Sequence, residues 1–156
     1  MMQQKQMRDE ICLRIRQRLD WIHSTAGDTV GGALKMRLLE TPCEQDTFRF
    51  LASTENWMRN VIGTLHGGSC AVMVDQAMGC VANCVISDPT PAPTSQLQLN
   101  FHRPMLAGED HFVDVQLVNL SVTMVHLQAR VYACREPDKI CVSASSIFFR
   151  RKKKGE

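Results

Sequence analysis

Apolar residues recur every three or four positions near the start of the chain, between residues 4 and 23, with Arg and Gln side chains among them. This spacing predicts an amphipathic helix. Gly27, in the following segment "STAGD", supplies a terminator for it. The apolar positions that define the stripe are Met7, Ile11, Ile15, Leu19 and Ile22.

The pattern then changes to the alternation of apolar and polar residues that is typical of β-strands. Two such stretches cover residues 30–40 and 46–53, and the turn segment "TPCEQD" separates them. Residues 66–86 are too many for one strand and are apolar nearly all round, which predicts a buried central helix. The segment "SDPTPAP" at 87–93 ends that helix.

Four more alternating stretches follow, at residues 94–102, 110–119, 123–135 and 139–150. Short connections such as "RPMLAGE" and "EPD" predict antiparallel neighbours. Six strands that bury one face against a single apolar helix predict an α+β domain whose sheet curls around that helix. We therefore expect an N-terminal amphipathic helix (1–28), one domain (29–150) and a basic C-terminal tail (151–156).

Composition and charge narrow the function classes. The chain has 156 residues, of which 44% are hydrophobic and 22% charged, as in an ordinary soluble globular protein. The net charge of +2 comes partly from "RRKKK" at 150–154, so the rest of the chain is near neutral. A dedicated nucleic-acid-binding protein would carry a basic patch through its fold. We expect no nucleic-acid partner, and we interpret the tail as a solvated charged end.

The cysteines and the N-terminal residues indicate the cellular compartment in which the protein is expected. Seven cysteines without CxxC spacing indicate reduced thiols, not a disulfide framework. The first residues resemble neither a signal peptide nor a transit peptide. Asp75, Gln76, Gly79 and Asn83 interrupt the most apolar stretch, so it is not expected to span a membrane. We expect a cytoplasmic protein without a membrane partner.

The start of the predicted central helix is a candidate functional site. Gly67 and Gly68 lie where backbone N–H groups lack partners within the helix and where the helix dipole is positive. Glycine lets a ligand approach these N–H groups closely. The helix start is therefore a candidate site for a carbonyl oxygen that becomes an oxyanion. A plain tight turn into the helix explains the same residues equally well.

Asp75 is a carboxylate among apolar neighbours, and burying it is costly without compensation. No Arg or Lys between residues 60 and 102 can pair with it. Asp75 follows Gly67 by eight residues, about 12 Å along a helix, so the two cannot contact one carbonyl carbon. An antiparallel copy of the helix across a two-fold axis would bring the partner's acid to this glycine. The alternative is an Asp satisfied by a buried hydrogen bond.

The spacing N-x-x-G-x-L-H-G-G-x6-D, from Asn60 to Asp75, resembles the hotdog-fold acyl-CoA thioesterases, and more narrowly their PaaI-like (phenylacetate-type) branch. The segment "TSQLQLNFHRP" resembles the strand of that family that ends in an aromatic-x-Arg-Pro element, and "AGE" follows it. The resemblance covers roughly residues 29–150. It implies a hotdog fold, with a curled antiparallel sheet wrapped around one long helix.

The resemblance also implies catalytic roles. Gly67 matches the position whose backbone N–H polarises the thioester carbonyl, and Asp75 matches the acid that acts as general base on water or as nucleophile. Asn60 matches a side-chain contact to the thioester or the attacking water. Thr94 matches a hydroxyl that helps to orient the water or the acid. His66 belongs to the motif and is expected to support the loop geometry and bind the substrate carbonyl.

Further residues are expected to bind substrate, and coenzyme A would be part of that substrate, so no separate cofactor is expected. The segment "NLSVTMVH" lacks the Gly-Lys/Arg pair that the family usually has there. The candidates for the phosphates of coenzyme A are therefore Arg103, Arg150, Arg151 and Lys152. The remaining candidate substrate contacts are Gly68, Met78 and Ser95. The five histidines show no HxxxH or HxxE spacing, so no metal site is expected.

Three hypotheses for the function remain. The first is a thioester hydrolase assembled as a homodimer or a dimer of dimers. The second is a non-catalytic acyl-CoA binding or sensor module. The third is a hotdog dehydratase or hydratase, but His66 at the mouth of the site suits its base poorly. Cys70 and Cys80 are expected to pack in the core, and no GxSxG elbow supports a serine hydrolase.

Overall fold

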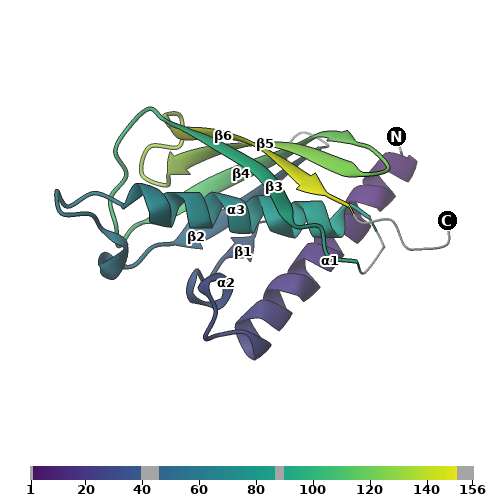
Figure 1. The fold of residues 1–156 in the computed structure, drawn as a ribbon, viewed down its shortest axis with the longest axis horizontal. Helices are drawn as coiled ribbons and strands as arrows, with labels where there is room; N and C mark the ends of the chain where they lie inside the picture. The colour runs from purple at the N-terminus through teal and green to yellow at the C-terminus, as the bar shows by residue number, and fades with distance from the viewer. Residues whose placement is uncertain (1, 40–45, 87–89, 151–156) are drawn as a thin grey trace.

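A computed structural model describes residues 2–39, 46–86 and 90–150, with side chains from residue 6 onward. One six-stranded antiparallel sheet lies over a long helix, α3 (Gly67–Cys84), and a second long helix, α1 (Met2–Thr25), crosses near the C-terminal end of α3 (Figure 1). This arrangement confirms the predicted α+β architecture.

Helix α1 confirms the amphipathic helix expected from the sequence. Ile11, Ile15, Leu19 and Ile22 are buried and join the same core as α3, whereas Met7 at the start of the predicted stripe is exposed. Arg14 donates from Nε to the carbonyl oxygen of Cys84 at 2.8 Å. A cation at the C-terminal end of α3 also interacts favourably with the helix dipole.

The strand predicted over residues 30–40 is wrong in its first part. Residues Val30–Ala33 form a short helix, α2, and only Arg37–Leu38 form a strand, β1. The reason is local: Thr29 is the N-cap, and its Oγ1 accepts a hydrogen bond from the N–H of Gly32 at 3.3 Å. An N-cap hydroxyl satisfies a free helical donor, and this outweighs the alternating pattern.

The other predicted strands are confirmed to within about two residues at each end. Their bounds are β2 Thr47–Ser53, β3 Thr94–Phe101, β4 Asp110–Leu120, β5 Met124–Ala133 and β6 Ile140–Phe149. The order across the sheet is β1-β2-β4-β5-β6-β3, and every pair of neighbours is antiparallel. The expectation that the short "RPMLAGE" connection joins neighbouring strands is wrong, because β3 pairs with β6 at the edge and β4 lies between β2 and β5.

Helix α3 confirms the predicted central helix, and its buried face meets the inner face of the sheet. The largest completely buried side chains include Phe50 from β2, Met73 and Met78 from α3, and Phe148 from β6. Val72 on the opposite side of α3 is 38% exposed, so in a single chain the helix is not covered all round.

Five of the described cysteines are free thiols: Cys70, Cys80, Cys84, Cys134 and Cys141. Cys43 lies outside the described residues. The tail at 151–156 also lies outside the described residues. None of the helices that the structure describes is long and apolar enough to cross a membrane.

Candidate functional site

The imidazole of His66 caps the start of α3. Its Nδ1 accepts the N–H of Gly68 at 2.9 Å, and its own backbone N–H donates to the carbonyl of Met58 at 2.8 Å. An imidazole that accepts at Nδ1 carries its proton at Nε2 when it is neutral. His66 therefore holds the loop and the helix start together, and within the described ranges its Nε2 has no hydrogen-bond partner.

The first helical N–H is available to a ligand. Gly67 is exposed, and within the described part of the chain its backbone N–H has no acceptor. A Cβ atom at Gly67 would lie 3.5 Å from the ring of Phe101, the last residue of β3. The backbone N–H of Gly67 therefore lies near Phe101, which is itself 56% exposed. A donor at a helix N-terminus in this setting suits a carbonyl oxygen that gains negative charge.

Asp75 lies midway along α3 and is half-buried. The hydroxyl of Thr94, at the start of β3, donates to its Oδ1 at 2.8 Å. No cation forms an ion pair with Asp75 among the residues that the structure describes. A neutral hydroxyl therefore orients the carboxylate, and its negative charge is not neutralised by a neighbouring side chain.

Helix α2 packs beside this acid. A Cβ atom at Gly31 would lie only 2.9 Å from Oε1 of Gln76, the residue that follows Asp75. The absence of a side chain at Gly31 lets α2 approach α3 at this point. Sequence reasoning missed the contact, and the signal for it was the capping residue Thr29 followed by a glycine pair.

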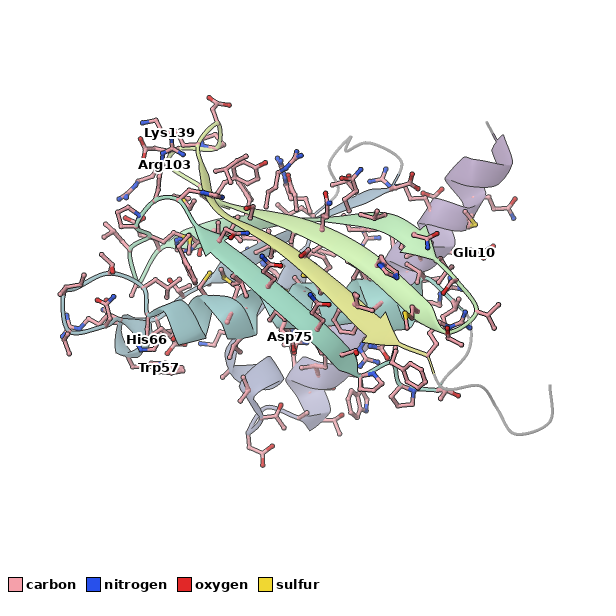
Figure 2. All side chains as sticks on the ribbon, turned by 45° about the horizontal axis from the view of Figure 1, so that its top comes forward. Glu10, Trp57, His66, Asp75, Arg103 and Lys139 are labelled. Carbon is pink, nitrogen blue, oxygen red and sulfur yellow. The ribbon has the colours of Figure 1, made fainter. Side chains whose placement is uncertain are left out.

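The structure does not bring Gly67 and Asp75 of one chain together. Helix α3 runs without interruption between them, so they are about 12 Å apart along its axis. Figure 2 shows His66 at the first turn of α3 and Asp75 far along the same helix, beside the edge of the sheet. One chain therefore carries two half-sites: the amide with Phe101, and the acid with Thr94.

Asn60 organises the loop before α3. Its Nδ2 donates to Oγ1 of Thr64 at 2.8 Å, and its Oδ1 accepts the N–H groups of Ile62 and Thr64 at 3.1 and 3.0 Å. Gly63 completes this turn with φ of +90°, a conformation that favours glycine. The side chain predicted to contact the thioester or water is thus engaged mainly within its own loop.

The remaining expected substrate contacts are spread over the fold. Ser95 is exposed next to Thr94, whereas Met78 is completely buried in the core. Arg103 follows Phe101 by two residues and donates from Nη1 to the carbonyl of Ile140 at 2.8 Å. Its side chain lies near Lys139 (Figure 2). Arg150 donates from Nη1 to the carbonyl of Ser121 at 3.2 Å. Arg151 and Lys152 lie outside the described residues.

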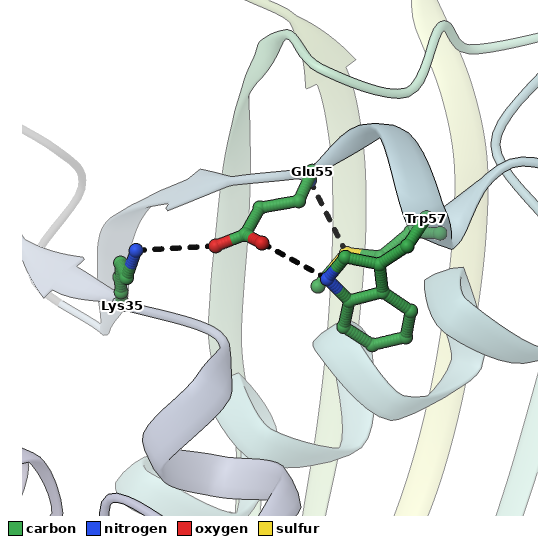
Figure 3. Close-up of polar contacts among 4 residues, drawn as sticks. Lys35, Glu55 and Trp57 are labelled. Atoms are coloured by element: carbon green, nitrogen blue, oxygen red, sulfur yellow. Dashed lines mark hydrogen bonds and ion pairs between the residues drawn. The ribbon is translucent and has the colours of Figure 1, made fainter.

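An exposed indole lies close to the helix start and was not predicted. Trp57, in the short 3-10 helix Asn56–Met58, donates from Nε1 to Oε2 of Glu55 at 2.9 Å, and Lys35 contacts Oε1 of the same carboxylate at 3.1 Å (Figure 3). The hydrogen bond from Lys35 and then that from Trp57 lower the pKa of Glu55. Because Met58 is bonded to His66, this cluster holds an aromatic surface near the amide half-site.

Cys70 and Cys80 are buried in α3. Burial raises the pKa of Cys70 and of Cys80 to about 12, so neither is a thiolate at neutral pH. Among the described residues no group of three or more His, Cys, Asp or Glu side chains could hold a metal ion.

Solved structures with this fold include several thioesterase-family proteins. A phenylacetic acid degradation-related protein from Ralstonia eutropha is 17% identical, with a TM-score of 0.74 over 88% of this chain and 99% of that one. The PaaI protein of the E. coli phenylacetic acid degradation operon is 14% identical, with a TM-score of 0.69 over 88% and 91%. A Streptococcus mutans protein bound to acetyl CoA is 19% identical, with a TM-score of 0.63 over 76% and 91%.

Sequence comparison gives the family. No curated protein sequence matches the chain. The family model described as "Thioesterase superfamily" matches residues 62–151, which is more than half of the chain and includes α3 and all the strands from β3 to β6. The chain therefore belongs to the thioesterase superfamily, and its hotdog fold is similar to that of the E. coli PaaI protein.

Proposed function

We propose that the protein is an acyl-CoA thioesterase whose active sites form between two antiparallel copies of α3. The observation that carries this proposal is the pair of half-sites on one helix. Gly67 offers an N–H without an acceptor among the described residues, and Asp75 offers a carboxylate oriented by Thr94. Because about 12 Å of helix separates them, one chain alone cannot present both to the same thioester.

The edge of the sheet supports a two-fold assembly. Among the described strands β3 pairs only with β6, so no described strand meets the backbone donors and acceptors of its other edge. Asp75 lies beside this edge, because Thr94 belongs to β3. A second copy that pairs antiparallel along β3 would set its α3 antiparallel to this one. Each Asp75 would then face the Gly67 of the other copy, and two equivalent sites would form.

In the proposed reaction, the N–H of Gly67 binds the thioester carbonyl oxygen. Asp75 of the other copy accepts a proton from water as the water oxygen attacks the carbonyl carbon. The resulting oxyanion is held by the Gly67 amide, and the C–S bond then breaks. The proton held by Asp75 passes to the departing sulfur of coenzyme A, which regenerates the carboxylate, and the carboxylic acid leaves. The acetyl CoA seen in the Streptococcus mutans protein supports a coenzyme A thioester as the substrate class.

A thiol-release assay on a panel of short, medium, long-chain and aryl acyl-CoAs tests the activity. We expect turnover that falls about 100-fold or more in Asp75→Asn, the scale for loss of a positioned base. Asp20→Asn, on the exposed face of α1, is the matched control and should leave turnover unchanged. Tight binding of the panel without any turnover would contradict the proposal and favour a non-catalytic acyl-CoA binding module.

A complementation experiment tests the composite site. Gly67→Pro removes the N–H, and proline is favoured at the first position of a helix. His66 has φ of −63° and ψ of 135°, which suits a residue before proline. Asp75→Asn and Gly67→Pro should each be inactive, but co-expression should restore about a quarter of wild-type activity, because half of the dimers then contain one intact site. No recovery would overturn the composite site, because Gly67 of one copy and Asp75 of the other would then not act on the same thioester.

A further inference from the structure

Phe101 is an aromatic residue on the inner face of the sheet, and α3 leaves much of it uncovered. Strand register sets it opposite Val142 of β6, which is completely buried, and residues directly opposite each other share one face of a sheet. Leu97 and Leu99 precede it on the same face of β3 and are half-buried, whereas Phe101 is 56% exposed. The core-facing side of β3 therefore opens to solvent at its last residue.

A glycine at the start of α3 faces this opening. A Cβ atom at Gly67 would lie 3.5 Å from Cζ and 3.9 Å from Cε1 of Phe101, so the outer edge of the ring is directed at Gly67. The backbone N–H of Gly67 has no acceptor among the described residues. A hydrogen-bond donor and an apolar ring thus lie side by side. Ligand sites have this composition, a mainly apolar lining with a few placed polar groups.

The chemistry of a thioester indicates which part of the substrate suits the ring. The carbonyl carbon carries two substituents, the acyl chain and the sulfur of coenzyme A. Beyond the sulfur, coenzyme A carries amide groups and phosphates, which lose hydrogen bonds with water when they are buried against an apolar surface. A saturated acyl chain has no polar atom beyond its carbonyl group, and packing it against the Phe101 ring removes apolar surface of both from water.

We propose that Phe101 is a specificity-determining residue that packs against the acyl chain of the substrate. This inference rests on the thioester hydrolysis proposed above. In that arrangement Gly67 of one copy faces Asp75 of the other, and antiparallel pairing along β3 brings Phe101 of one copy toward Thr94 of the other. The ring then lies beside the carbonyl bound at Gly67, and Asp75 approaches the same carbonyl from the other copy. Phe101 contacts the substrate and takes no part in proton transfer.

The dependence of hydrolysis on chain length tests this assignment. Thiol release is measured for acetyl-, butyryl-, hexanoyl- and octanoyl-CoA with the wild type and with Phe101→Ala. Each methylene group that leaves water contributes a factor of about four to binding. In Phe101→Ala we therefore expect the ratio of kcat/KM for octanoyl-CoA to kcat/KM for acetyl-CoA to fall about tenfold, while kcat/KM for acetyl-CoA changes by less than about threefold.

Two further variants separate contact with the acyl chain from an effect on the fold. Phe101→Leu keeps a large apolar side chain at this position and should retain most of the wild-type ratio. Trp21→Ala removes an aromatic side chain that is 57% exposed on α1, and should leave the ratio unchanged. Circular dichroism and sedimentation of each variant should match the wild type, because these side chains are largely outside the core.

The outcomes distinguish this assignment from the proposed function itself. A wild type that turns over no acyl-CoA would contradict thioester hydrolysis and the role of Phe101 with it. Wild-type turnover together with an equal loss for every acyl-CoA in Phe101→Ala would overturn only the role of Phe101, because the ring would then support the helix start or contact coenzyme A. An unchanged ratio in Phe101→Ala, or wild-type turnover restricted to acetyl-CoA, would overturn that role as well.

Discussion

Asp75 lies among core residues of α3, but its own side chain is not fully buried. Its neighbours Val74, Ala77 and Met78 are completely buried, but its own carboxylate is half-buried and reaches the edge of the sheet. The partner there is a hydroxyl, not a cation. Thr94 therefore directs the carboxylate without cancelling its charge, which is the condition for an acid that accepts a proton from water.

This contact predicts the effect of Thr94→Val. Valine keeps the branched shape that suits a strand, so the fold should be retained. Without the hydroxyl, Asp75 is less well oriented, and we expect kcat for thioester hydrolysis to fall about tenfold or more while KM changes little. Gln98→Ala, at an exposed position of the same strand, is the control and should retain kcat. An unchanged kcat in Thr94→Val would show that the hydroxyl has no part in positioning the acid.

The sequence predicted some of the candidate site and missed the rest for a physical reason. The motif from Asn60 to Asp75 is local, so its spacing could be read directly. The contacts of Gly67 with Phe101 and of Trp57 with Glu55 and Lys35 involve residues that only the fold brings together. Asn60 is a different case, because its bonds within the 60–64 turn follow from backbone geometry that spacing alone does not specify.

At the scale of elements, α2 is the short segment where a capping residue overrides the strand pattern. Thr29 caps it, and Gly31 and Gly32 let it fit between α1 and α3. A side chain at each of the two glycines would contact different atoms. A Cβ at Gly31 would meet the far end of the flexible Gln76 side chain, whereas a Cβ at Gly32 would meet backbone atoms of Ala26 and Gly27.

The two glycines therefore predict different stabilities. Gly32→Ala should lower the free energy of unfolding by about 1–3 kcal/mol, because the backbone at Ala26 and Gly27 must move. Gly31→Ala should change it by less than about 1 kcal/mol, because Gln76 can change rotamer and alanine favours a helix. Urea denaturation of both variants measures the difference. Equal losses in the two variants would contradict the account of how α2 packs.

Element boundaries were predicted well and element neighbours less well. Helix α3 and strands β2 to β6 carry clear periodicity, and their ends follow local turn signals. The position of β3 beside β6 depends instead on pairing between segments far apart in the sequence. Hydrophobic pattern shows which face of a strand is buried and does not show which strand lies next to it, so the crossing from β3 to β4 was not foreseen.

At the scale of the whole molecule, the core under the sheet contains one histidine. His111 lies on the inner face of β4, between Ala52 of β2 and Ala133 of β5, and is completely buried. Neither ring nitrogen has a hydrogen-bond partner among the described residues. Burial lowers the pKa of His111 from its ordinary value of 6.5; the charge and the backbone of Glu109 and the charge of Asp110 oppose this shift, and Arg135 adds to it.

This pKa shift predicts how stability depends on pH. Above pH 6.5 the imidazole is neutral in both the folded and the unfolded chain, so its contribution to stability is fully present. Below pH 6.5 the imidazole becomes protonated in the unfolded chain, whereas in the folded chain it is protonated only at a lower pH. The free energy of unfolding should therefore fall with pH, by at most about 1.4 kcal/mol per pH unit for this one group.

Urea denaturation between pH 7.5 and 5 of wild type and His111→Leu isolates this effect from the acids that also titrate. Leucine removes the proton-binding group and leaves no unpartnered ring nitrogen, so the variant should be at least as stable at pH 7.5 and lose less stability on acidification. His23→Gln, at an exposed position of α1, should keep the wild-type pH dependence. If His111→Leu loses stability as steeply as wild type, the acid sensitivity of the fold arises elsewhere, and the buried imidazole is not the group that couples proton uptake to unfolding.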